Sequence, residues 1–78
     1  MQAPESRDMG PQPLGRLMEE LSLKPHNLVE ASPDQITHKL VSRAIKGRWL
    51  TPHSQRLIVR AWRAATGRNE GVGELFGY

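Results

Sequence analysis

Residues 37–47 read THKLVSRAIKG, and this stretch decides the fold expected of the chain. Thr37 suits a helix N-terminus because its side-chain oxygen accepts from the free N–H groups of the first turn. Gly47 suits the end of that helix because glycine reaches the left-handed conformation without strain. The apolar residues between them share one helical face: Leu40, Val41, Ala44 and Ile45. The polar residues share the other: His38, Lys39, Ser42, Arg43 and Lys46. We predict a helix from His38 to Lys46 with one side in the core and a cationic side outward.

Two helices are predicted before this one. The first begins near Pro13 and ends near Ser22, because apolar residues recur there at the spacing of one helical face: Leu14, Leu17, Met18 and Leu21. The second begins at Lys24-Pro25, since proline's missing N–H would be unbonded at a first helical position. It ends at Ser32-Pro33-Asp34, because proline disfavours helical geometry in the residue before it. Ile36 is then expected to be a buried plug in the connection.

The longest helix is predicted to begin at Thr51-Pro52, run to Thr66 and stop at Gly67. Its inward stripe comprises Leu57, Ile58, Ala61, Trp62 and Ala65. Four helices with short connections, and no alternation typical of strands, favour an all-α bundle.

We expect the folded domain to span residues 13–67, so that both ends of the chain lie outside it. Residues 1–12 combine prolines, a glycine and polar residues without an apolar period, which indicates a disordered arm. Residues 68–78 contain three glycines and two acids, and we expect a flexible tail. The tail contains the apolar residues Leu75, Phe76 and Tyr78. An alternative is therefore that it docks on the core or on a partner.

Composition excludes several classes of protein. The 78 residues allow one domain, and the absence of cysteine excludes disulfides and thiolate metal sites. No stretch approaches the roughly 18 to 20 apolar residues that cross a bilayer, and no signal-peptide layout is present, so we expect a cytoplasmic protein with no membrane partner.

His26, His38 and His53 lack ligand-like spacing, which argues against a metal site. No catalytic constellation or phosphate-binding loop can be assembled, so we expect no cofactor and no enzyme activity.

The charge is divided between the two halves of the chain. Residues 1–34 hold three basic side chains against six acidic ones. Residues 35–69 hold eight basic side chains and no acidic one: Lys39, Arg43, Lys46, Arg48, Arg56, Arg60, Arg63 and Arg68. A solvated helix normally mixes both signs, because like charges four positions apart oppose it. This basic half therefore indicates a polyanionic partner, of which nucleic acid is the leading candidate.

The short helix, the break and the cationic helix that ends in Lys46-Gly47-Arg48 resemble the helix-turn-helix domains of the lambda-repressor-like (Xre/Cro) class. Further residues carry the resemblance: Ala31, Ile36, Thr37, Val41, Ala44 and the Leu50-Thr51-Pro52 run. It covers about fifty residues, 14–66, and departs from the class at Gln35, where the turn usually has glycine. It implies a small four-helix bundle that binds double-stranded DNA.

In this class the third helix inserts its N-terminal part into the major groove. The resemblance therefore implies a set of base-reading candidates: Thr37, His38, Lys39, Ser42 and Arg43. Lys46, Arg48 and Arg56 would flank the groove and meet phosphates, which fix register without reading sequence. For Arg60, Arg63 and Arg68 a phosphate contact and a purely solubilising role are equally open.

The two tryptophans raise the question of base stacking, which proteins that bind single strands use. Trp62 falls on the predicted core stripe, so we expect it in the core. Trp49 lies in a connection, where packing on the core edge is favoured over protrusion.

The leading hypothesis is a double-stranded DNA-binding domain, such as a small transcriptional regulator. The same charge together with Trp49 keeps open an RNA- or ribosome-associated binder. A third alternative is a protein-interaction module whose basic face docks an acidic helix. The sequence also leaves a homodimer open.

Overall fold

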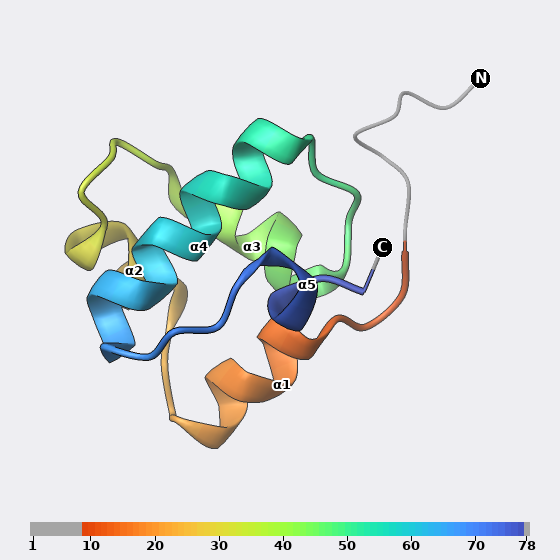
Figure 1. Cartoon of the computed structure of the whole chain (residues 1–78), viewed down its shortest axis with the longest axis horizontal. Coiled ribbons are helices and arrows are strands. Elements are labelled where there is room, and N and C mark those ends of the chain that lie inside the picture. The colour runs from red at the N-terminus through yellow and green to blue at the C-terminus, as the bar shows by residue number, and fades with distance from the viewer. Residues whose placement is uncertain (1–8, 78) are drawn as a thin grey trace.

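The computed structural model describes residues 9–77, which form five helices (Figure 1). They are α1 (Pro13–Glu20), α2 (Pro25–Ala31), α3 (His38–Lys46), α4 (Pro52–Thr66) and α5 (Val72–Leu75). No strand forms within residues 9–77, so the predicted all-α class is confirmed. None of the helices in this range combines the length and the apolarity needed to cross a membrane.

The bounds of the helices follow local signals in the sequence. Proline occupies the first turn of α1, α2 and α4, where its missing N–H costs no hydrogen bond. The hydroxyl oxygens of Thr37 and Thr51 accept backbone N–H groups at the starts of α3 and α4. Gly47 and Gly67 end the same two helices with φ of 87° and 73°. The predicted bounds of α3 and α4 are confirmed, and α1 ends two residues before the predicted Ser22.

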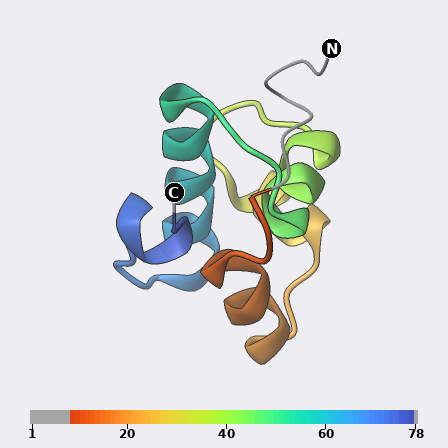
Figure 2. The same ribbon diagram turned by 90° about the vertical axis from the view of Figure 1, so that its right-hand side faces the viewer.

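Helix α4 contacts α2, α3 and α5, while α1 packs against α3 and α5 (Figures 1 and 2). The core between them consists of Leu14, Met18, Leu28, Ile36, Val41, Ala44, Leu50, Ile58, Val59, Ala61, Trp62, Leu75 and Phe76. Burial of Ile36 and Trp62 confirms the prediction for both. The predicted stripe of α4 is confirmed in its central part, because Leu57 and Ala65 are only partly buried while Val59 is buried instead.

The structure corrects the expectation of a flexible tail for residues 72–76 and agrees with the alternative in which Leu75 and Phe76 dock on the core. Residues 72–75 form a fifth helix where the sequence predicted four helices in all. Leu75 and Phe76 are 0% and 2% exposed and belong to the core cluster. Because α5 packs against both α1 and α4, these side chains fill space that the first four helices leave open. Tyr78 lies outside the described residues.

Residues 9–12, which were expected to belong to a disordered arm, pack against the rest of the domain. Residues 1–8 lie outside the described part of the chain. Met9 donates its backbone N–H to the carbonyl oxygen of Gly47 at 2.7 Å, and Gln12 is buried at 8% exposure. The packed part of the chain therefore begins before Pro13 and extends to Phe76.

Candidate nucleic-acid interface

The polar side of α3 carries a shallow hollow of about 270 Å³. Five of the eight predicted site residues line it: Lys39, Ser42, Arg43, Lys46 and Arg48. The first four are spaced at i, i+3, i+4 and i+7, which places them on one face of the helix. The fifth comes directly after the glycine that ends α3. Each described residue that lines this hollow is one of the predicted site residues.

The ends and the inner side of α3 fix the direction in which this face points. Thr37 Oγ1 accepts a 3.0 Å hydrogen bond from the N–H of Leu40 at one end. On the side opposite the hollow, Val41 and Ala44 are fully buried. Turning the helix about its axis would expose both, and burial of an aliphatic side chain such as valine stabilises a protein by about 1.5–3 kcal/mol. The cationic face is therefore held toward solvent by the core.

Four cations surround the hollow, and no carboxylate among residues 9–77 lines it. Among residues 9–77, neither Lys39 nor Arg43 nor Lys46 forms an ion pair. Like charges four positions apart, as at Lys39 and Arg43, oppose helix formation by about 0.2–0.5 kcal/mol. This arrangement therefore costs stability in the free protein, and a bound anion would relieve the repulsion.

Three predicted site residues do not line the hollow. Thr37 is exposed, but its hydroxyl oxygen is engaged in capping α3. His38 is exposed at the first position of α3, and Arg56 is exposed on α4. The structure therefore brings the residues of α3 and its C-terminal exit together, and leaves these three outside that group.

The remaining arginines of the basic half contact acidic residues. Arg60 Nε lies 2.7 Å from Oδ2 of Asp34. Arg68 forms an ion pair with the side chain of Glu70 at 2.5 Å, and Arg63 Nε donates to the carbonyl oxygen of Glu70 at 3.3 Å. The acidic residues nearest to the basic half thus engage these three arginines, which favours a structural role for them over phosphate contact.

The two tryptophans differ in burial. Trp62 is fully buried, which confirms the prediction, and its indole N–H donates to Oε1 of Glu70 at 2.8 Å. This hydrogen bond is the largest of the effects that lower the pKa of the Glu70 carboxyl below its ordinary value. Partial burial of the carboxyl acts in the opposite direction and raises the pKa, whereas Arg68 lowers the pKa further. Trp49 is half-buried, so its ring is not a freely projecting stacking platform.

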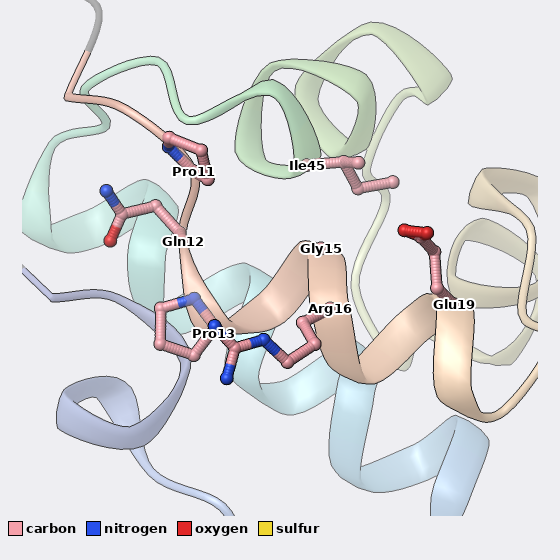
Figure 3. A pocket seen from close by; sticks show the side chains of 7 residues that line it. All are labelled: Pro11, Gln12, Pro13, Gly15, Arg16, Glu19 and Ile45. Carbon is pink, nitrogen blue, oxygen red and sulfur yellow. The ribbon is translucent and has the colours of Figure 1, made fainter.

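A larger hollow of about 520 Å³ lies between α1 and α3 (Figure 3). Gly15 lets the two helices approach closely there, since a Cβ at this position would lie 3.1 Å from the carbonyl oxygen of Ile45. Figure 3 shows Glu19 pointing from α1 toward α3, while Arg16 points away from α3. The one charged side chain that faces α3 here is thus an acid, so this hollow does not suit a polyanion, and the hollow lined by Lys39 and Arg43 is the candidate site.

Comparison with models of known protein families, with curated protein sequences and with solved structures finds no match to this chain. The resemblance to the lambda-repressor-like class therefore rests on the residues of this chain alone.

Proposed function

We propose that this chain is a double-stranded DNA-binding domain of helix-turn-helix type, which serves as a small transcriptional regulator. In this proposal α2 and α3 are the two helices of the motif, and α3 meets the major groove. The observation that carries the proposal is the hollow on the exposed face of α3, where four cations and one hydroxyl gather without a carboxylate from the described part of the chain.

The charge distribution supports a polyanion rather than a single small anion. Arg56 on α4 is a further exposed cation, outside the hollow. If Lys39, Arg43, Lys46, Arg48 and Arg56 each neutralise one phosphate, the logarithm of the binding constant falls with the logarithm of salt concentration at a slope of about −4.5. A slope of this size distinguishes polynucleotide binding from recognition of one charged group.

The test is a fluorescence anisotropy titration of labelled duplex DNA at several salt concentrations. The double variant Lys39→Gln/Arg43→Gln should bind more weakly and lower the magnitude of the slope by about 1.8, since two phosphate contacts are lost. The matched control Arg16→Gln/Lys24→Gln removes the same charge from exposed positions outside the hollow and should leave the slope unchanged.

Three results would contradict the proposal. One is the absence of binding at low salt, and another is binding that does not respond to salt. The third is an equal loss of affinity in the two double variants, which would show that binding depends on the net charge of the protein and not on the residues of the hollow. Competition with structured RNA belongs to the same experiment, and displacement of duplex DNA by RNA at lower concentration would favour the RNA-binding alternative.

A further inference from the structure

We infer that Gln12 is a positioning residue for Arg48, one of the cations that line the hollow on α3. The inference rests on the proposed function, in which Arg48 contacts the bound duplex. Gln12 itself does not line that hollow. It acts through residues 9 and 10, which lie against the end of α3 where the chain leaves the helix.

Arg48 is held differently from the other four residues that line the hollow. Those four belong to α3, where the hydrogen bonds of the helix and its buried inner side hold the backbone. Arg48 lies in the connection between α3 and α4, directly after Gly47, whose φ is 87°. The place of its side chain therefore depends on the contacts that this connection makes.

The peptide group between Gly47 and Arg48 is held from two sides. On the side of α3, the N–H of Arg48 donates to the carbonyl oxygen of Arg43 at 3.0 Å. On the other side, the N–H of Met9 donates to the carbonyl oxygen of Gly47 at 2.7 Å. Both bonds act on one planar unit, so together they fix its orientation. The backbones are also in contact, because the carbonyl oxygen of Gly10 occupies the place that a Cβ of residue 47 would take.

Gln12 holds residues 9 and 10 against this peptide group. Its Nε2 donates to the carbonyl oxygens of Met9 and Gly10 at 3.1 and 3.0 Å, and its Oε1 accepts the N–H of Gly77 at 2.6 Å. Residues 9 and 10 precede α1, so no helix holds them, and Gly10 has φ of 80°. Loss of the Gln12 amide should loosen this segment, and with it the peptide group that carries Arg48.

A double-mutant cycle in the full chain tests this inference, with the affinity for duplex DNA at low salt as the measurement. Gln12→Met keeps the length of the side chain but lacks the amide that makes the three hydrogen bonds. Gln12→Met and Arg48→Gln should each weaken binding, and the double variant should bind no more weakly than Arg48→Gln alone. We expect its affinity to exceed the product of the single effects by about twofold or more, as for residues of one network.

A second variant reaches the same contact without changing Gln12. Met9→Pro removes the N–H that bonds to Gly47, at a side chain that is 39% exposed and outside the core. It should show the same dependence on Arg48 as Gln12→Met does. Far-UV circular dichroism and urea unfolding verify that each variant is folded.

Two controls separate positioning of Arg48 from a general loss of stability. Lys39 is held by α3, so the effects of Gln12→Met and Lys39→Gln on affinity should multiply. Gly67→Ala should cost stability at the end of α4 and leave the affinity of the folded protein unchanged.

Two results would overturn the inference and leave the proposed function intact. One is unchanged affinity in both Gln12→Met and Met9→Pro, and the other is effects of these variants that multiply with that of Arg48→Gln. Failure of the unsubstituted protein to bind any duplex at low salt would overturn the proposed function and this role of Gln12 together.

Discussion

Gln12 and Gly77 are joined by a 2.6 Å hydrogen bond, in which the N–H of Gly77 donates to Oε1 of Gln12 across 65 positions of sequence. The same side chain uses Nε2 to donate to the carbonyl oxygens of Met9 and Gly10, at 3.1 and 3.0 Å. Gln12 is 8% exposed, so one buried amide holds the segment before α1 and the segment after α5 together.

Replacement of this amide should destabilise the whole domain. We expect Gln12→Ala to lower the free energy of unfolding by about 1–3 kcal/mol, because three hydrogen bonds of a part-buried amide are lost. Urea denaturation followed by tryptophan fluorescence measures the change. The matched control is Gln35→Ala, an exposed residue, for which we expect a change within about 0.5 kcal/mol. Equal effects at the two positions would show that the amide does not connect the termini in solution.

Three glycines allow backbone strain to be separated from steric overlap. Gly67 has φ of 73° and open space around its Cα, so Gly67→Ala should cost about 1–2 kcal/mol for the left-handed conformation alone. Gly47 has φ of 87°, and a Cβ there would overlap the carbonyl oxygen of Gly10. Gly47→Ala should therefore cost clearly more than Gly67→Ala.

Gly73→Ala is the control in this series, because residue 73 lies inside α5 with open space around it and no positive φ. We expect no loss of stability there, since alanine is the better helix former. Urea unfolding of the three variants gives the order directly. A cost at Gly47 equal to that at Gly67 would mean that the Met9–Gly10 segment moves away from α3 without penalty.

The buried aromatic side chain after α5 should be essential for stability. Phe76 is 2% exposed, and truncation of a buried phenylalanine to alanine costs about 3–5 kcal/mol. Phe76→Ala should therefore remove much of the stability of a domain whose total is on the order of 5–15 kcal/mol. Leu21→Ala is the control, because Leu21 is 39% exposed, and it should change stability by less than 1 kcal/mol. Similar effects for the two variants would place Phe76 outside the core in solution.

The sequence predicts the helices of this fold well because their signals are local. Thr37 and Thr51 start helices, and Gly47 and Gly67 end them, through hydrogen bonds or backbone angles that involve only a few neighbouring residues. The grouping of Lys39, Arg43 and Lys46 follows as well, since residues four and three apart share a face once the helix is known.

The parts that the sequence does not predict depend on tertiary space. Helix α5 has only four residues, too few to show an apolar period, and Phe76 is buried because α1 and α4 leave room for it. Gln12 lies in a segment rich in proline and glycine, where nothing local indicates that a polar side chain is buried. The ion pair of Arg60 with Asp34 is likewise tertiary, because the two residues lie 26 positions apart in sequence. The sequence alone therefore does not show that Arg60 is engaged away from the candidate site.

Glu70 should make stability depend on pH in the acidic range. The Trp62 indole N–H donates to its carboxylate, which holds the pKa of Glu70 below the ordinary value of 4.5, and Arg68 acts in the same direction. Because the pKa is lower in the folded than in the unfolded state, the ionised group stabilises the fold above pH 4.5. That contribution is lost as the pH falls below 4.5 and through the folded-state pKa.

Urea unfolding of the unsubstituted protein and of Glu70→Gln, measured from neutral pH to below pH 4.5, tests this directly. Glutamine keeps an acceptor for the Trp62 indole but does not titrate, so the difference in stability between the two proteins should shrink as the pH falls through this window.

Trp62→Phe removes the donor that contributes most to the shift while an aromatic ring stays in the core. In that background the effect of Glu70→Gln should depend less on pH, because the folded-state pKa of Glu70 moves back toward its unfolded value. Stability curves that stay parallel for the unsubstituted protein and Glu70→Gln would show that the indole and the carboxylate do not interact in solution.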